Sequence, residues 1–184
     1  MNRTNGKIAE QSKEKIVNAL LTIMQQYDYK EITITQITQE AELSRRTFYR
    51  LFTDKEAVLS HLLEKLFIEC SSFLNSLSLN NYWDIVQGYF DFWESHKDLL
   101  LLFKKNNLLS YIFEEAYRYS FHIFETIRSQ TIVDTYAFPL PYMLAYSVGG
   151  MHSMLLKWIE NDMPIPSTIL IQELKQAFKA CDEI

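Results

Sequence analysis

Glycine, proline and cysteine are scarce in this sequence: its 184 residues include four glycines, four prolines and two cysteines. So few turn-forming residues cannot supply the many tight turns of a β-sandwich or a large antiparallel sheet. The apolar fraction of 48% is nevertheless high enough to bury a substantial core. The composition therefore predicts one or two folded domains built of long helices with short connections.

The sequence also lacks the usual signatures of catalysis and metal binding. Cys70 and Cys181 lie far apart and form no CxxC or Cys/His pattern, which disfavours a disulfide framework and a zinc site. The four histidines fall on four different predicted helices, without HxxxH or HExxH spacing. A glycine-rich phosphate loop and a GxSxG nucleophile motif are also missing. We therefore expect no metal, no cofactor and no enzymatic activity.

Long apolar runs are missing as well, and charge is unevenly distributed. The longest aliphatic run, 99–103, is far too short to cross a bilayer, and the first residues lack the apolar stretch of a signal sequence. We therefore expect a soluble, cytoplasmic protein. Residues 1–60 contain nine Lys/Arg and eight Asp/Glu, a net charge of +1, whereas residues 61–184 contain nine and fifteen, a net charge of −6. A nucleic-acid contact would therefore need a local basic patch in the N-terminal part.

Hydrophobic periodicity predicts about nine helices and no strand. The clearest amphipathic stripe spans Lys13–Tyr27. Two short helices follow: the first begins at a capping box formed by Thr33 and Gln36, and the second runs over 45–52 after an N-cap at Ser44. Further helices are predicted from an N-cap at Thr53 or Asp54 to about residue 80, over 83–95, 97–105, 108–129 and 139–161, and after Pro166.

The short helix over 45–52 has two distinct faces. Steps of about 100° per residue place a polar set on one side and an apolar set on the other: Arg45, Arg46, Tyr49 and Arg50 against Phe48, Leu51 and Phe52. Arginine can form paired hydrogen bonds to a guanine edge or a phosphate, and tyrosine adds a hydroxyl on a stiff ring. Two short helices joined by a tight turn, the second with such a basic face, are the layout of a helix-turn-helix DNA reader. The two helix N-termini and a nearby lysine would add phosphate contacts.

This segment resembles the DNA-binding head of the TetR family of bacterial transcriptional regulators. The resemblance rests on TITQI at 33–37 and on AELSRRTFYRLFTDKEAVL at 41–59. It implies an all-α fold, with a three-helix helix-turn-helix domain over residues 1–55 and a helical effector-binding and dimerisation domain over residues 56–184. The stretch AYSVGG at 145–150 also resembles part of the family's penultimate helix. The DNA-binding residues expected are Thr33, Ser44, Arg45, Arg46, Thr47, Tyr49, Arg50 and Lys55.

Two residues depart from the family's pattern. Glu42 stands where the family usually has glycine, so an acidic side chain is carried towards the DNA on a backbone that favours glycine. Leu51 stands where the family often has an aromatic residue or histidine that contacts phosphate. Glu42 would repel backbone phosphates unless Arg45 or Arg46 neutralises it.

Aromatic residues are concentrated in the C-terminal part of the chain. Of the 12 Phe, 11 Tyr and 3 Trp, only five lie in residues 1–60. Most belong in a core, but buried tyrosine and tryptophan need polar partners, and such a domain suits a flat apolar ligand. Together with the resemblance, this predicts an effector pocket lined by Phe67, Phe90, Trp93, Phe103, Tyr117, Phe121 and Tyr146.

A palindromic operator requires two recognition helices about 34–36 Å apart, so we expect a homodimer. The helix over 139–161 and the last helix carry more apolar surface than one core-facing stripe requires. The adjacent Gly149 and Gly150 each cost about 1 kcal/mol relative to alanine, which a closely approaching helix would explain, either across the two-fold axis or within one protomer. The expected four-helix interface contains Val148, Gly149, Met151, Leu155, Ile159, Leu170, Leu174 and Phe178.

The sequence thus predicts a sequence-specific DNA-binding transcriptional regulator. In this hypothesis a repressor leaves its palindromic double-stranded operator when a small apolar or aromatic effector changes the separation of the two heads. An alternative is a TetR-like interaction protein that has lost DNA binding and acts through a protein partner, for which Glu42 is the sequence hint. A third hypothesis, an α-helical enzyme, lacks any catalytic signature.

Overall fold

The computed structural model describes residues 3–112, 114–116, 118–119 and 140–181. The chain divides into two compact units, Met1–Lys65 and Leu66–Ile184, which we call the N-terminal unit and the C-terminal unit. Across the described residues the regular elements are all helices, which confirms the all-α prediction. Within those same ranges, no helix is long and apolar enough to cross a membrane.

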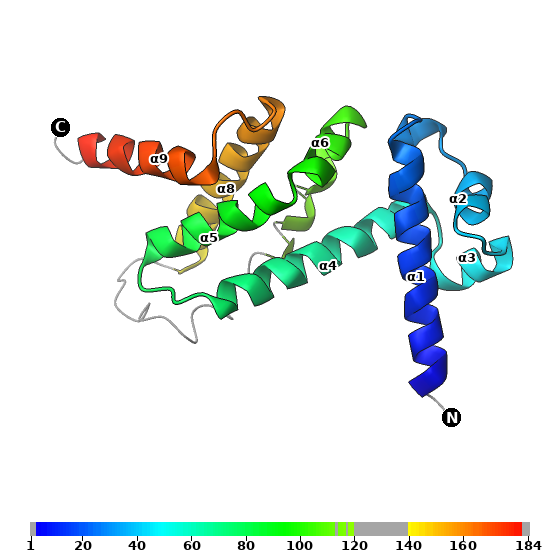
Figure 1. Cartoon of the computed structure of the whole chain (residues 1–184). Coiled ribbons are helices and arrows are strands. Elements are labelled where there is room, and N and C mark those ends of the chain that lie inside the picture. The colour runs from blue at the N-terminus through cyan, green and yellow to red at the C-terminus, as the bar shows by residue number, and fades with distance from the viewer. Residues whose placement is uncertain (1–2, 113, 117, 120–139, 182–184) are drawn as a thin grey trace. The chain divides into compact units, whose positions relative to one another are not determined.

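The N-terminal unit consists of α1 (Arg3–Met24), α2 (Ile34–Glu40), α3 (Arg45–Leu51) and the first part of α4 (Lys55–Ser76). A 3-10 turn, η1 (Tyr29–Glu31), connects α1 to α2. Figure 1 shows α2 and α3 together along one side of α1. The helix predicted over residues 13–27 differs from α1 at both ends. α1 begins earlier, at Arg3, because its polar first turns carry no apolar stripe for a sequence pattern to detect, and it ends at Met24 rather than at Tyr27.

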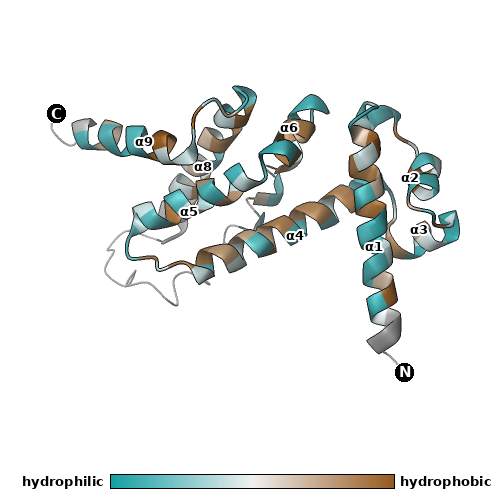
Figure 2. Cartoon of the chain, viewed as in Figure 1, coloured by the Kyte–Doolittle hydropathy of each residue, from teal (hydrophilic) through white to brown (hydrophobic). Residues whose placement is uncertain are grey.

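Apolar side chains from all four helices of the N-terminal unit meet in one core. Figure 2 shows hydrophobic and hydrophilic patches alternating along α1 and α4, as expected for helices with one buried face. Full burial of such a side chain is worth about 1.5–3 kcal/mol. The core side chains that are at most 1% exposed are Ile16, Leu20, Met24, Ile37, Phe48, Val58, Leu59 and Leu63.

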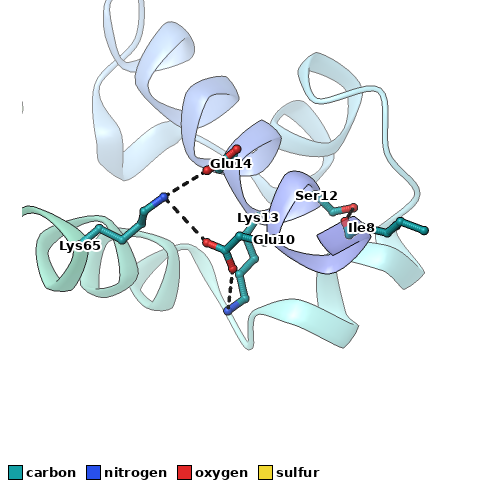
Figure 3. Close-up of polar contacts among 6 residues, drawn as sticks. All are labelled: Ile8, Glu10, Ser12, Lys13, Glu14 and Lys65. Atoms are coloured by element: carbon teal, nitrogen blue, oxygen red, sulfur yellow. Dashed lines mark hydrogen bonds and ion pairs between the residues drawn. The ribbon is translucent and has the colours of Figure 1, made fainter. Parts of the chain in front are cut away.

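An ionic network joins α4 to α1 on the surface of the N-terminal unit (Figure 3). The Lys65 ammonium group lies 3.3 Å from the Glu14 carboxylate and 3.8 Å from that of Glu10. Lys13 lies 4.0 Å from the same Glu10 carboxylate. These side chains are between 31% and 54% exposed, so each pair contributes at most about 1 kcal/mol.

The C-terminal unit contains the rest of α4 with α5 (Tyr82–Ser95), α6 (Lys97–Lys105), α8 (Leu140–Glu160) and α9 (Ser167–Cys181). Residues 109–112, 114–116 and 118–119 are also helical. The helix predicted over 108–129 therefore lies partly outside the described residues, as does the predicted start of the next helix at residue 139.

Close packing and buried polar contacts hold the C-terminal unit together. A Cβ atom added at Gly88 of α5 would lie 2.9 Å from a side-chain methyl group of Leu74 in α4 and 2.7 Å from one of Leu77, directly after that helix. Glycine at this position therefore allows α5 to approach α4. At the start of α9 the buried Ser167 hydroxyl donates to the Asp91 carboxylate of α5 at 2.6 Å. This bond docks the N-terminus of α9 on α5.

Three helix ends in the described part of the chain are closed without glycine. Glu42, Asn107 and Asp162 each follow a helix in the left-handed backbone region, with φ of 54°, 58° and 62°. At each end, this residue and the next donate their N–H groups back to carbonyls of the last turn, in the pattern of a Schellman cap. After α6, for example, Asn107 N–H donates at 3.0 Å and Leu108 N–H at 2.9 Å. The positions that most favour glycine thus carry other residues.

Candidate nucleic-acid interface

The two short helices of the N-terminal unit are fixed by caps at their ends. The Thr33 hydroxyl accepts from Gln36 N–H at 3.3 Å, and the Gln36 side chain accepts from Thr33 N–H at 2.8 Å, which confirms the predicted capping box. The Ser44 hydroxyl accepts from Thr47 N–H at 3.1 Å and confirms the predicted N-cap of α3. The Thr47 hydroxyl lies 3.0 Å from that of Ser44, so both are already engaged within the helix end.

The turn between α2 and α3 passes through Glu42. With φ at 54°, its backbone adopts the conformation that the family's usual glycine would favour. Glu42 N–H donates to Gln39 at 3.1 Å and Leu43 N–H donates to Thr38 at 2.9 Å. The side chain is exposed, and the structure gives it no ion pair with any described residue, Arg45 and Arg46 included. The carboxylate is therefore not neutralised by a neighbouring arginine.

The helix α3 has one polar and one apolar face, as its sequence predicted. Phe48 is fully buried and Phe52, directly after the helix, is 7% exposed. Tyr49 is 50% exposed, and the three arginines at 45, 46 and 50 are all exposed. Leu51 differs slightly from the expectation of a core residue because it is only half-buried. The basic face is thus free to meet a ligand.

One arginine of this face is held by the tyrosine. The Arg45 guanidinium donates to the Tyr49 hydroxyl at 3.5 Å and lies 5.9 Å from the ring centroid. This i,i+4 contact lies at the outer limit of hydrogen-bond length, so it orients the two side chains and adds little stability.

The structure places Lys55 differently from the sequence expectation of a DNA contact. Its ammonium group donates to the carbonyl oxygens of Tyr29, Lys30 and Ile32 at 2.7, 3.2 and 3.0 Å. It also lies 4.5 Å from the centroid of the Tyr29 ring. All three of its donors are used to close η1 against the start of α4. We therefore correct this prediction: Lys55 links two segments of the N-terminal unit by hydrogen bonds. The cap of α4 itself is Asp54, whose carboxylate accepts from Ala57 N–H at 2.7 Å.

The residues expected to line an effector pocket are mostly core residues of the C-terminal unit. Phe67, Phe90, Trp93 and Phe103 are at most 1% exposed, and the Phe67 and Trp93 rings lie 5.3 Å apart. Tyr146 differs from these core residues because it is 69% exposed, and its place in a pocket stays a prediction. Two further predicted residues, Tyr117 and Phe121, lie outside the described residues.

Sequence reasoning missed a buried polar pair beside these aromatic rings. The Tyr89 hydroxyl lies 3.2 Å from His152 Nδ1, and His152 Nε2 lies 3.4 Å from the Ile112 carbonyl oxygen. Burial lowers the pKa of His152 and raises that of Tyr89 well above its ordinary value. Burial likewise raises the pKa of the nearby Cys70 thiol to about 12. The side chains of Tyr89, His152 and Cys70 are therefore neutral near pH 7. In the sequence, the only sign of this buried cluster was that each of the three residues falls on an apolar stripe of a helix.

The expected dimer interface is corrected at two positions. Leu155 and Ile159 of α8 are fully buried within the C-terminal unit itself, so they cannot meet a second chain. Phe178 of α9 is 44% exposed, and the other five expected residues are half-buried: Val148, Gly149, Met151, Leu170 and Leu174. An added Cβ at Gly149 or Gly150 would meet no described atom within 4 Å. A helix of the same chain is therefore not the reason for these glycines within the described part of the structure.

The chain matches the family model of the bacterial regulatory proteins of the tetR family over residues 16–62. Among solved structures, the fatty acid degradation regulator FadR from Bacillus halodurans has a TM-score of 0.62 at 16% identity, covering 90% of this chain and 93% of that one. A TetR transcriptional regulator from Streptococcus agalactiae 2603V has a TM-score of 0.61 at 20% identity, covering 94% and 96%. A TetR-family regulator from Streptomyces coelicolor has a TM-score of 0.56 at 19% identity, covering 91% and 81%. No curated protein sequence is significantly similar to the chain.

The capped helix pair and its basic second helix define the N-terminal unit as a helix-turn-helix domain. Over residues 16–62 this domain is similar to the tetR family of bacterial regulatory proteins, and the whole chain has the fold of the TetR-family regulators among the solved structures.

Proposed function

We propose that the protein is a dimeric, sequence-specific DNA-binding regulator that represses transcription until a small effector binds its C-terminal unit. The observation that carries the proposal is the face of α3, where three exposed arginines and Tyr49 lie opposite the buried Phe48. The N-terminal part of the chain also has a net positive charge, in contrast to the acidic remainder. Both features favour contact of this unit with phosphates and base edges.

DNA binding is tested with the full-length protein and the DNA upstream of its own gene, in a gel shift or by fluorescence anisotropy. Tyr49→Ala and Arg46→Ala should abolish binding and leave the melting temperature nearly unchanged, because both side chains are exposed. Phe52→Ala, the control, should instead destabilise the N-terminal unit by about 3–5 kcal/mol. Affinity should fall roughly 10³- to 10⁵-fold between 50 and 200 mM salt if about 6–10 phosphates are contacted. Unchanged binding by Tyr49→Ala would refute the assignment of this face.

Pairing of two chains through α8 and α9 is the second part of the proposal. Tyr142 and Tyr146 of α8 are each 69% exposed, unusually bare for large aromatic residues, and the open glycines at 149 and 150 follow on the same helix. Such a surface is suited to close approach of a second helix, and we expect it to bury more than about 1,000 Å² in the dimer. The palindromic operator follows from this two-fold arrangement.

The dimer is tested by Tyr146→Glu, which is exposed in one chain and so should fold. Light scattering should then show monomers, and specific DNA binding should be lost with the pairing of the two recognition helices. Tyr27→Glu is the matched control, because Tyr27 is a 50% exposed tyrosine of the N-terminal unit. A Tyr146→Glu protein that remains dimeric would place the interface elsewhere.

The effector we propose is a small apolar or aromatic compound that binds among the aromatic residues of the C-terminal unit. Support comes from Trp93, whose buried indole N–H lies near the Tyr89 hydroxyl but has no partner of good hydrogen-bond geometry among the described residues. A buried donor without a partner costs about 1–3 kcal/mol, which an acceptor on a bound compound would recover. Binding should raise the thermal midpoint and weaken DNA binding by the same coupling. A broad compound screen that moves neither the midpoint nor tryptophan emission would favour a ligand-free regulator.

An interaction protein without DNA binding is the second candidate, and the Glu42 carboxylate favours it. This negative charge lies in the turn before α3, and no ion pair with a described residue offsets it. A dimer that binds no duplex from its own upstream region at low salt, and that gains no affinity on Glu42→Gln, would support this candidate over the first.

A further inference from the structure

The exposed face of α3 offers a narrow set of base-reading side chains. The helix has the sequence RRTFYRL and contains no Asn, Gln, Asp or Glu. Paired hydrogen bonds to adenine require Asn or Gln, and acceptance from the amino group of cytosine requires a carboxylate. Arginine instead matches the O6 and N7 acceptors of guanine. Guanine is therefore the one base that α3 can read through paired hydrogen bonds.

The three arginines of α3 are not equivalent. Arg45 is oriented by its contacts with the Tyr49 hydroxyl at 3.5 Å and the Tyr49 ring at 5.9 Å. Arg46 and Arg50 make no ion pair or hydrogen bond with any described residue, and both are exposed. Their guanidinium forks thus remain available to a ligand, whereas that of Arg45 is already engaged at one edge.

Arg46 and Arg50 differ in their position along α3. In a helix-turn-helix, the N-terminal residues of the recognition helix contact base edges. Arg46 is the second residue of α3, while Arg50 lies in its last turn. Arg46 is therefore the one arginine of α3 that has a guanidinium without a described partner and also lies at the end of the helix that enters the major groove.

We infer that Arg46 reads a guanine in each half-site of the operator, while the Arg45–Tyr49 pair contacts the phosphate backbone and sets the register of α3. This inference rests on the proposed function and extends it, because it names the base and the residue that carry sequence preference. Phosphate contacts by Arg45 and Tyr49 position the helix but carry no sequence information. Loss of Arg46 should therefore change which sequence is bound, and loss of the pair should change how tightly every sequence is bound.

The test is selection of bound duplexes from a random library by the full-length protein, followed by sequencing. The enriched motif should contain a guanine at a fixed position in each half-site. Exchange of that G·C pair should weaken binding by about 5- to 150-fold. Replacing the guanine by 7-deazaguanine, which pairs normally but lacks the N7 acceptor, should weaken binding by about fivefold or more.

Charge-conserving variants then assign the guanine to a residue. Arg46→Lys retains the positive charge but loses the planar fork, so exchange of the G·C pair should cost this variant less affinity than the parent, while its affinity for random duplex and its salt dependence stay unchanged. Arg45→Lys is the matched control one residue away and should retain the guanine requirement. Tyr49→Phe keeps the ring but loses the hydroxyl and should weaken binding to all duplexes alike.

Each outcome distinguishes the inference from the function on which it rests. A motif without guanine, or a guanine preference that is as strong in Arg46→Lys as in the parent, overturns the inference and leaves sequence-specific DNA binding intact. A guanine requirement that is weakened in Arg45→Lys instead also overturns the inference. A library from which no duplex is enriched overturns the proposed function, and the inference with it.

Discussion

Replacement of Glu42 by glycine should stabilise the N-terminal unit and also strengthen DNA binding, and the two effects have separate causes. Glu42 holds a left-handed backbone with φ at 54°, which costs a residue other than glycine roughly 1–2 kcal/mol. Glycine removes this cost, but its greater conformational freedom in the unfolded chain lowers the free energy of unfolding by about 0.4–1 kcal/mol. The net stabilisation is therefore about 0.5–1 kcal/mol, or a rise in the thermal midpoint of about 1–4 °C for a protein of this size.

The second effect of this substitution comes from the lost charge. A carboxylate 4 Å from a phosphate in water is repelled by about 1 kcal/mol, and by less at greater distance. Removing it should therefore tighten DNA binding by at most about fivefold, a gain that should shrink as salt rises. Both quantities are measured on the same preparations, by thermal denaturation and by fluorescence anisotropy with operator DNA.

The control is Glu42→Gln, which removes the charge but leaves a side chain on the left-handed backbone. It should bind DNA as tightly as Glu42→Gly, with the midpoint of the parent protein. Equal midpoints for the glycine and glutamine variants would refute the backbone argument. Unchanged affinity in both variants would show that the carboxylate does not face the DNA.

Three further predictions concern the C-terminal unit. Gly88→Ala should destabilise it by about 1–3 kcal/mol in denaturant titrations, because an added methyl group would overlap the side chains of Leu74 and Leu77 at the end of α4; a net stabilisation, as expected from the higher helix propensity of alanine, would contradict this packing. Ser167→Ala removes the 2.6 Å bond to the Asp91 carboxylate and should cost about 1.5–3 kcal/mol, so a parental midpoint would show that α9 docks by other contacts. Burial lowers the pKa of His152 from its ordinary 6.5, so the unfolded chain binds this proton more readily and stability should fall as the pH drops below about 6.5. His152→Gln should reduce that slope but not abolish it, because burial also lowers the pKa of His61; an identical slope would exclude His152 as a source.

Local features of the helix-turn-helix were predictable because their causes lie within a few residues. The Thr33 capping box and the Ser44 cap join positions three residues apart, and both are present. The two faces of α3 follow from helical spacing alone, which is why Phe48 is buried and Tyr49 exposed. The strained turn at Glu42 could likewise be anticipated from the family's preference for glycine.

Features that depend on distant parts of the chain could not be predicted in this way. The carbonyl partners of Lys55 lie 23 to 26 residues earlier in the chain, so its sequence position suggested only a basic residue beside the DNA. The apolar residues Leu155 and Ile159 formed a stripe, but a stripe does not reveal whether the same chain or a second chain covers it. The exposure of Tyr146 could not be predicted for the same reason, since an aromatic residue in a helix is compatible with either a core or a surface.

The hydrogen bonds of Lys55 to three backbone carbonyls have a consequence for the chemical reactivity of the N-terminal unit. An amine whose three hydrogens are directed at carbonyl oxygens must leave them before it can attack an acylating reagent. Labelling of Lys55 should therefore follow the opening of the junction between η1 and α4, whereas exposed amines such as that of Lys30 are labelled without any opening. Mass spectrometry of the modified chain would then use this one lysine as a built-in reporter of the integrity of the helix-turn-helix, with no dye or engineered probe required.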